Sequence, residues 1–242
     1  MTRIAVVTGG TRGIGLAITE RLHADGYKVA AVYGGNDEAA RACAERLPGV
    51  RCYKWDVGDF DACKTGLAQV EAELGPIDVL VNNAGITRDT FLHKMSLEQW
   101  RDVLRVDLDS VFFMTRPVIE GMRARGFGRI VNISSINGQK GQIAQTNYSA
   151  AKAGLIGFTK ALALEGAAKG ITVNVICPGY IDTEMVSAVP KEVLDKIIAT
   201  IPVGRLGSAA EIARCVAFLA GDEAGFITGA TLTANGGQYI AG

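Results

Sequence analysis

The sequence predicts an α/β protein with a doubly wound parallel sheet and helices on both of its faces. Short apolar runs alternate with helical patterns along the whole chain, as expected when a parallel sheet is covered on both sides. The first run leads through a glycine-rich turn into a helix, and polar or glycine residues follow several later runs. Because the carboxyl ends of parallel strands share one edge, these turns are expected to meet on one rim of the sheet, where ligands bind.

Length and composition favour one globular domain over residues 1–242. The hydrophobic fraction is 48%, and Lys+Arg and Asp+Glu both number 25, which argues against a nucleic-acid or membrane-surface role. No apolar run approaches the roughly 20 residues that span a bilayer, and no leader is evident. Scattered cysteines without a Cys-x-x-Cys pair indicate free thiols in a cytoplasmic protein and no metal site.

The first strand and turn, residues 4–15, predict a phosphate site. The strand at residues 4–7 is followed by Gly9-x-x-x-Gly13-x-Gly15 and then a helix over residues 14–23. This arrangement presents free N–H groups and a positive helix end to a phosphate. The spacing differs from the Gly-x-Gly-x-x-Gly fingerprint and from a P-loop. We expect a Rossmann-type dinucleotide site, with a turn that binds no ligand as the alternative.

The second strand, residues 28–33, indicates which dinucleotide is preferred. A carboxylate at its tip would bind the ribose 2′-hydroxyl of NAD and repel a 2′-phosphate. The chain instead continues as Gly34-Gly35-Asn36, and the first carboxylate is that of Asp37. Arg12, in the phosphate turn, could reach a 2′-phosphate, although it could also be a solvated turn residue. The pattern favours NADP, as NADPH, over NAD.

The later elements follow the same alternation. Strands are predicted at residues 50–55, 77–81, 129–135, 171–176 and 228–234, and helices at residues 36–47, 59–74, 97–123, 148–169 and 208–220. Asp59, Ser96 and Ser208 are the expected N-caps of three of these helices. The segment at residues 181–199 leaves this pattern, contains Pro190, and is expected to form a lid over the substrate.

Tyr148 and Lys152 are candidates for proton transfer. They are four residues apart in a predicted helix, so both side chains leave the same face. A tyrosine has a pKa of about 10, and a nearby ammonium group lowers it by favouring the phenolate. Ser135, at the end of the predicted strand 129–135, could hold a carbonyl oxygen. A tyrosine and a lysine at this spacing are usually only helix surface, and the other rim motifs are what favour a functional pair.

These motifs together resemble the short-chain dehydrogenase/reductase family. The resemblance rests on Thr8-Gly9-x-x-x-Gly13-x-Gly15, Asn82-Asn83-Ala84-Gly85, Ser135, Tyr148-x-x-x-Lys152 and Pro178-Gly179, and it covers essentially the whole chain. Within the family, the segments at residues 86–89, 137–142, 145–148 and 178–181 are similar to those of the acetoacetyl-CoA reductases of polyhydroxybutyrate synthesis. The 3-oxoacyl-[acyl-carrier-protein] reductases of fatty acid synthesis are the next most similar group.

The resemblance implies a reaction and a set of residues. NADPH would reduce acetoacetyl-CoA to (R)-3-hydroxybutanoyl-CoA, with Tyr148 as proton donor, Lys152 holding the nicotinamide ribose and Ser135 binding the oxygen. The implied catalytic residues are Ser135, Tyr148, Lys152 and Asp107. The implied cofactor residues are Gly9, Thr11, Arg12, Gly13, Ile14, Gly15, Gly34, Asn36, Asp56, Val57, Asn83, Ala84, Gly85, Ile86, Tyr148, Lys152, Pro178, Gly179 and Ile181. The implied substrate residues are Asp89, Lys94, Ser135, Gln142, Gln145, Tyr148, Gly179 and Tyr180.

Asp107 departs from the family pattern. Relatives commonly have an asparagine here, which is thought to hold a water on a proton path to the lysine. Asp107 can still serve if the contact uses the backbone carbonyl, and its carboxylate would also favour a charged Lys152.

Alternatives to acetoacetyl-CoA remain. A carrier-protein reductase is expected to carry a basic patch beside its active site, and the balanced charge neither supports nor excludes one. A reductase of sugars, steroids or other ketones would differ in the segment 181–199. A non-catalytic NADP-binding protein disagrees with the presence of Ser135, Tyr148 and Lys152. The resemblance also implies a homotetramer built through the long helices and the last strand.

Overall fold

The computed structural model of the chain describes residues 2–183, 186 and 190–240. Seven strands form one parallel sheet in the order β3-β2-β1-β4-β5-β6-β9. The order runs outward in both directions from β1, as in Rossmann-type folds. The predicted doubly wound α/β fold is therefore confirmed.

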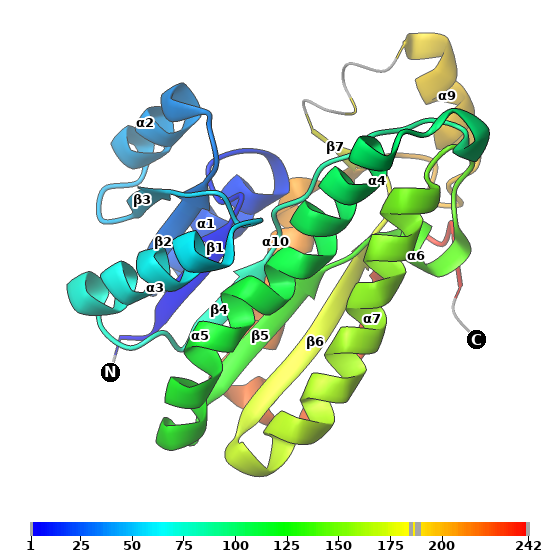
Figure 1. Cartoon of the computed structure of the whole chain (residues 1–242). Coiled ribbons are helices and arrows are strands. Elements are labelled where there is room, and N and C mark those ends of the chain that lie inside the picture. Colours follow the sequence, from blue (N-terminus) through cyan, green and yellow to red (C-terminus); the bar gives the residue numbers. More distant parts are fainter. Residues whose placement is uncertain (1, 184–185, 187–189, 241–242) are drawn as a thin grey trace.

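The elements alternate along the chain as Figure 1 shows. The strands are β1 (Ile4–Thr8), β2 (Lys28–Tyr33), β3 (Arg51–Lys54), β4 (Val79–Asn82), β5 (Gly128–Ile133), β6 (Ile171–Pro178), β7 (Ile181–Asp182), β8 (Gly207–Ser208) and β9 (Thr231–Ala234). The α-helices are α1 (Gly13–Ala24), α2 (Asp37–Arg46), α3 (Phe60–Leu74), α4 (Leu97–Leu104), α5 (Ser110–Arg125), α6 (Ile136–Lys140), α7 (Thr146–Gly166), α9 (Lys191–Ala199) and α10 (Ala209–Ala220). The shorter helical turns are η1 (Leu92–Lys94), η2 (Arg105–Asp109), η3 (Ala167–Lys169) and η4 (Asp222–Phe226).

Helices cover both faces of the sheet, which explains why the strands are apolar throughout. Successive strand residues point to opposite faces. Val6 of β1 packs in the core with Leu67 of α3 and Met114 of α5, whereas Val7 packs in the other core with Ile18 of α1. Figure 1 shows α3, α5 and α7 on one side of the sheet, with α1 and α10 on the other.

Three predicted N-caps are confirmed. The side chain of Asp59 accepts a hydrogen bond from the third residue of α3. Ser96 and Ser208 each form a reciprocal capping box, with Gln99 and Glu211 respectively. These bonds satisfy N–H groups that a helix start leaves without a partner.

Two boundaries differ from the prediction near the rim. The helix predicted over residues 97–123 is interrupted by a π-helical turn, Arg105–Asp109, between α4 and α5. The strand predicted over residues 129–135 ends at Ile133, because the Ser135 side chain accepts a hydrogen bond from the Asn137 N–H and caps the short helix α6. The predicted strand included Ser134 and Ser135, and the local pattern did not show that Ser135 caps a helix.

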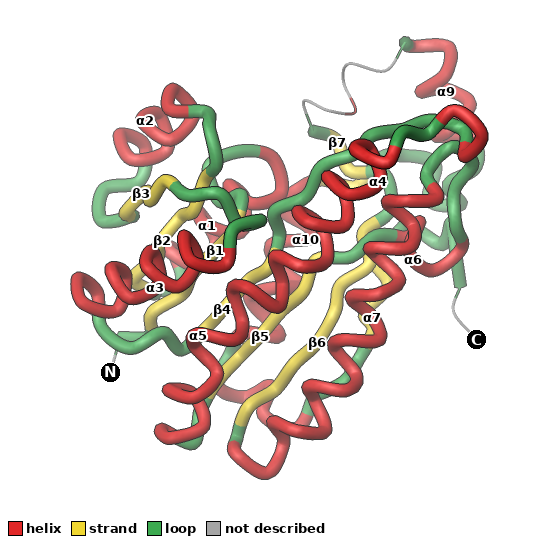
Figure 2. Tube along the Cα trace, in the orientation of Figure 1, coloured by secondary structure: helices red, strands yellow, loops and turns green. Residues whose placement is uncertain are grey.

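The segment after β6 contains β7, which pairs with β8, and α9 (Figure 2). Part of the predicted lid, residues 184–185 and 187–189, lies outside the described residues. Pro190 immediately precedes α9. None of the described helices is long and apolar enough to cross a membrane.

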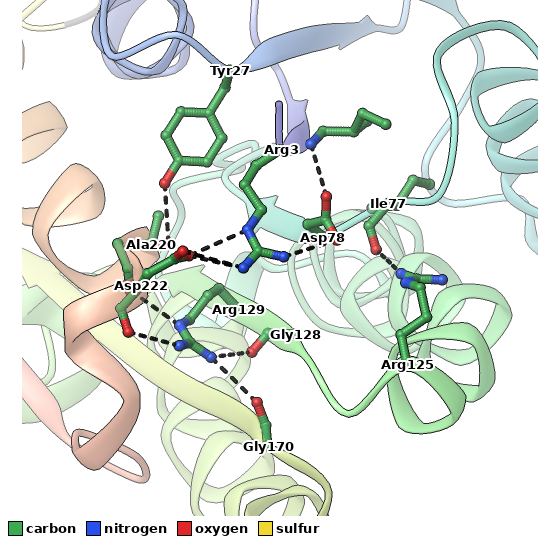
Figure 3. Close-up of polar contacts among 12 residues, drawn as sticks. Arg3, Tyr27, Ile77, Asp78, Arg125, Gly128, Arg129, Gly170, Ala220 and Asp222 are labelled. Atoms are coloured by element: carbon green, nitrogen blue, oxygen red, sulfur yellow. Dashed lines mark hydrogen bonds and ion pairs between the residues drawn. The ribbon is translucent and has the colours of Figure 1, made fainter. Parts of the chain in front are cut away.

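The amino ends of the strands are closed by an arginine cluster (Figure 3). The buried Arg129 guanidinium donates hydrogen bonds to the carbonyl oxygens of Gly128, Gly170, Gly221 and Asp222. Arg129 and Arg3 both lie over the Phe127 ring, 4.3 Å and 3.4 Å from its centre. Because this end of the sheet is already filled by its own hydrogen bonds, a ligand site is favoured at the opposite, carboxyl end.

Candidate active site

The ends of β1 and β4 are joined at the carboxyl rim. The Thr8 hydroxyl accepts hydrogen bonds from the backbone N–H groups of Asn83, at 2.9 Å, and Ala84, at 3.0 Å. The Asn83 side-chain amide donates to the Thr8 carbonyl oxygen at 2.9 Å. The phosphate turn and the Asn83–Gly85 segment, both predicted to bind the cofactor, are thus neighbours.

Glycines let the phosphate turn approach this joint closely. Gly9 and Gly13 have positive φ angles of 64° and 54°, which suit glycine. A Cβ on Gly15 would collide with the Gly9 carbonyl and the Asn83 amide, so only glycine lets α1 begin here. No side chain among the described residues caps α1, and its first turn holds no acidic residue. The N–H groups of that first turn are left for an anion.

A cavity of about 240 Å³ opens between this turn and α2. Its lining contains four of the predicted cofactor residues, namely Thr11, Arg12, Gly13 and Asn36. The Asp37 carboxylate, the first after β2, is held by Lys54 at 2.9 Å and by the Tyr33 hydroxyl at 3.1 Å. These hydrogen bonds lower the pKa of Asp37 and keep its charge neutralised outside the cavity.

Asp56, predicted to face the adenine, has a partner that the sequence did not reveal. Its carboxylate lies 2.6 Å from the Arg105 guanidinium and accepts a hydrogen bond from the Gly58 N–H at 2.8 Å. Although partial burial opposes it, these two donors lower the pKa of Asp56. Val57 is buried beside it. Arg105 begins the π-helical turn, and no spacing in the sequence pairs it with Asp56.

The predicted catalytic side chains meet where β5 ends. The Ser135 hydroxyl, which caps α6, lies close enough to the Tyr148 hydroxyl on α7 to lower the pKa of Tyr148. The Lys152 ammonium lies one helical turn further along, 5.6 Å from the centre of the Tyr148 ring. It donates a hydrogen bond to the Ile133 carbonyl oxygen at 3.1 Å. The i, i+4 prediction for Tyr148 and Lys152 is therefore confirmed geometrically.

Asp107 lies directly against Lys152. Its Oδ2 is 3.3 Å from the Lys152 Nζ, and its Oδ1 accepts a hydrogen bond from the Ile86 N–H at 2.8 Å. The exposed fractions are 1% for Asp107 and 3% for Lys152. Gly85 lies over the pair, since a Cβ there would stand 2.8 Å from the Asp107 Oδ2 and 3.2 Å from the Lys152 Nζ. The open face beside Gly85 suits a flat ligand.

Burial and neighbouring charges set the protonation of this group. Burial raises the pKa of Tyr148, while Lys152 and Ser135 lower it and Asp107 opposes them. The net pKa is raised, so the expectation of a lowered value is wrong for the protein alone, because burial and Asp107 outweigh the lysine. Burial disfavours the Lys152 ammonium, but Asp107 and Tyr148 raise its pKa above the ordinary value.

Some of the predicted substrate residues form a connected group beside Tyr148. The Asp89 carboxylate accepts a hydrogen bond from Gln145 at 2.7 Å, and Gln145 in turn accepts one from Asn137 at 2.9 Å. Burial and then Asp89 raise the pKa of Tyr180, which places Tyr180 in the field of this group. Asn137 was not among the predicted substrate residues.

The remaining predictions are less connected. Gln142 precedes Gln145 in a tight turn. Lys94 ends the exposed turn η1, and no described contact joins it to Asp89 or Gln145. Pro178 ends β6, and the Gly179 N–H bonds the Ala234 carbonyl oxygen at 2.9 Å. Ile181 is buried in β7.

The fold and the site together define a Rossmann-type oxidoreductase that uses NAD or NADP. Residues 9–238 match the family model described as enoyl-(acyl carrier protein) reductase. The chain belongs to the short-chain dehydrogenase/reductase family.

Three relatives show how the similarity is distributed. The chain is 67% identical to an acetoacetyl-CoA reductase of Rhizobium meliloti, over 100% of both chains. It is 66% identical to an acetoacetyl-CoA reductase of Shinella zoogloeoides, over 99% of this chain and 100% of the relative. It is 47% identical to the 3-oxoacyl-[acyl-carrier-protein] reductase FabG of Escherichia coli, over 98% of both chains.

Proposed function

We propose that the protein reduces acetoacetyl-CoA to (R)-3-hydroxybutanoyl-CoA with NADPH and so supplies polyhydroxybutyrate synthesis. The observation that carries this proposal is the meeting of Ser135, Tyr148 and Lys152 beside the exposed Gly85. The 66–67% identity to acetoacetyl-CoA reductases supports the choice of substrate.

The three side chains have distinct roles in the proposed reaction. NADPH, when bound, supplies the hydride for the 3-keto carbon. The Ser135 hydroxyl donates a hydrogen bond to the keto oxygen as its negative charge grows. Tyr148 gives its phenolic proton to that oxygen, and Lys152 holds the ribose and stabilises the phenolate that remains. Because burial raises the pKa of Tyr148, its phenol stays protonated before the reaction.

The cofactor and acyl thioester occupy adjoining parts of the rim in this proposal. The N–H groups at the start of α1 would bind the pyrophosphate, and the neighbouring Asn83–Gly85 segment would hold the nicotinamide half. The connected pair Asp89 and Gln145, with Tyr180 in the field of Asp89, would line the substrate side.

The assay is the loss of NADPH on addition of acetoacetyl-CoA, with the product resolved by chiral chromatography. The proposal requires one NADPH consumed for each (R)-3-hydroxybutanoyl-CoA formed. Formation of the S product, or no consumption of NADPH, would refute it. A 3-oxoacyl-[acyl-carrier-protein] reductase is the second candidate, favoured by the 47% identity to the Escherichia coli enzyme.

The preference for NADPH is assigned to Arg12. It is exposed and lines the cavity beside the phosphate turn, where the 2′-phosphate would lie. Replacing Arg12 with alanine is expected to raise KM for NADPH about ten- to a hundredfold, since a hydrogen bond to a charged group contributes about 1.5–3 kcal/mol. KM for NADH should change little, because NADH lacks this phosphate.

Arg46→Ala provides the matched control. Arg46 lines the same cavity, but its guanidinium is paired with Glu20 at 2.8 Å. Its replacement is expected to change KM for NADPH much less than Arg12→Ala does. Equal losses of NADPH and NADH binding in Arg12→Ala would contradict the assignment.

We also propose that the chain is a homotetramer. A groove of about 570 Å³ lies between α5 and α7, and Leu164 on α7 is 84% exposed nearby. The lining of the groove combines apolar side chains with Arg116, Glu120, Arg123 and Glu165. Charges of both signs around an apolar centre suit a second copy of the same face across a two-fold axis.

The Ala161→Arg variant tests this interface. Ala161 is exposed and lines the groove, so the change should leave the fold intact and block association. Light scattering after size-exclusion chromatography is expected to show a smaller assembly than wild type. Ala68→Arg, at an exposed position on α3 outside the groove, should keep the wild-type size. An unchanged mass for Ala161→Arg would exclude this face.

We further propose that residues 1–242 act as one catalytic domain in the cytoplasm, with residues 181–199 as its substrate lid. The seven strands form one parallel sheet, so their carboxyl ends share a single edge, as expected of one domain. β7 begins two residues after Gly179, which supports a position beside the site for the start of this segment.

A further inference from the structure

The buried carboxylate of Asp107 has a contact that the proposed reaction does not use. The π-helical turn Arg105–Asp109 directs this side chain into the protein, where Asp107 is 1% exposed. Its Oδ1 is bonded to the Ile86 N–H, while its Oδ2 lies 3.3 Å from the Lys152 Nζ. Among the described residues, Oδ2 has no hydrogen-bond partner. Its contact with Lys152 is therefore mainly electrostatic.

An ion pair here changes what Lys152 does to Tyr148. A lone ammonium beside a phenol favours the phenolate, whereas a carboxylate beside that ammonium offsets its charge and repels the phenolate. The effect is strong because both partners are removed from solvent. An amide at position 107 could keep the bond from Ile86 but would carry no charge.

We propose that Asp107 is a positioning residue that keeps Tyr148 protonated to higher pH and so biases the enzyme toward reduction. This inference rests on the proposed function, in which Tyr148 donates the proton. Reduction needs the phenol, and the reverse reaction needs the phenolate. A raised tyrosine pKa therefore extends the pH range of reduction and restricts that of oxidation.

The charged and titratable groups around the pair come from several elements. Tyr148 is faced by Lys152 from α7, Asp107 from the π-helical turn, Asp89 from the loop after β4, and the Ser135 hydroxyl from the start of α6. Lys152 is faced in addition by Cys177 of β6. Asp107 is the acidic group in direct contact with Lys152, so its removal should have the largest effect of these neighbours.

The test is Asp107→Asn, which removes the charge and retains the shape. The readout is the position of the pH profile and not the height of its maximum. In the reduction of acetoacetyl-CoA, kcat/KM falls at alkaline pH, and this fall should move to lower pH by about one unit. In the oxidation of hydroxybutanoyl-CoA, kcat/KM rises from acid pH, and this rise should move to lower pH by the same amount. The sign follows because loss of the carboxylate lowers the Tyr148 pKa.

A titration of the protein without cofactor or substrate separates this inference from the proposed reaction. The absorbance of tyrosinate is followed from neutral to alkaline pH, and the absorbance of the matching Tyr148→Phe protein is subtracted from it. The Tyr148 signal should appear at lower pH in Asp107→Asn than in wild type. Asp89→Asn, whose carboxylate contacts Gln145 and not Lys152, should give a smaller shift.

The outcomes are distinct. If Tyr148 titrates at lower pH in Asp107→Asn but the wild-type protein does not reduce acetoacetyl-CoA, the role of Asp107 is supported and the proposed substrate is refuted. Unchanged titration and pH profiles in Asp107→Asn would overturn the inference. A loss of a hundredfold or more at every pH, with no shift, would also overturn it and assign the carboxylate a direct part in the reaction.

Discussion

Replacing Tyr148 with phenylalanine is expected to lower kcat for acetoacetyl-CoA reduction by about 10²–10⁴-fold, the usual contribution of a positioned general acid. The ring would remain beside Lys152, and only the hydroxyl near Ser135 would be lost. KM for NADPH should change little, because the phosphate turn and the cavity at Arg12 are untouched. Steady-state kinetics over a range of both substrates would measure the two effects separately.

Tyr27→Phe is the matched control for this variant. It removes one tyrosine hydroxyl, which bonds the Ala220 carbonyl oxygen at the opposite end of the sheet (Figure 3). Its activity should equal that of wild type, and both variants should unfold near the wild-type temperature. If Tyr148→Phe reduced ketones at the wild-type rate, Tyr148 would not be the proton donor.

Lys152→Met is expected to damage both activity and stability. Without the ammonium group, Asp107 is left as a buried carboxylate with only the Ile86 N–H as its described donor. Breaking a buried ion pair in this way typically lowers the free energy of unfolding by about 3–5 kcal/mol. Urea denaturation would measure the loss, and kcat should fall because the phenolate of Tyr148 is no longer stabilised.

The pH dependence of that loss has a definite sign. Burial already raises the pKa of Asp107, and without Lys152 it should rise further. The folded variant then binds a proton that the unfolded chain does not bind, so its stability increases as pH falls toward the acid range. The difference from wild type should therefore be greatest near neutral pH and smaller in acid.

A double variant distinguishes the two losses. Lys152→Met combined with Asp107→Asn leaves no buried charge at the pair and should recover most of the lost stability without recovering activity. A single Lys152→Met protein as stable as wild type at neutral pH would contradict the desolvated ion pair. Recovery of activity in the double variant would contradict the role of Lys152 in the reaction.

Much of the fold follows from local patterns. Apolar runs covered on both faces identified the parallel strands, and the caps at Asp59, Ser96 and Ser208 depend on side chains a few residues away. The i, i+4 spacing brought Tyr148 and Lys152 to one face for the same reason. Such features are readable because their partners are close in sequence.

The parts that were missed depend on contacts between distant residues. The bond from Arg105 to Asp56 joins the π-helical turn to the end of β3, and no periodicity encodes it. The raised pKa of Tyr148 depends on burial, which a local spacing does not give. Ser135 was placed on a strand because it follows a largely apolar run, and only the hydrogen bond from the Asn137 N–H shows that it caps α6.

The most direct test of the proposed function compares kcat/KM for NADPH oxidation with acetoacetyl-CoA and with acetoacetyl-carrier protein under matched conditions. A large preference for the CoA ester is the predicted result. A preference for the carrier protein would contradict the proposed substrate and assign the enzyme to fatty acid synthesis, with Ser135, Tyr148 and Lys152 in the same roles. No activity with either thioester would reject this substrate class altogether.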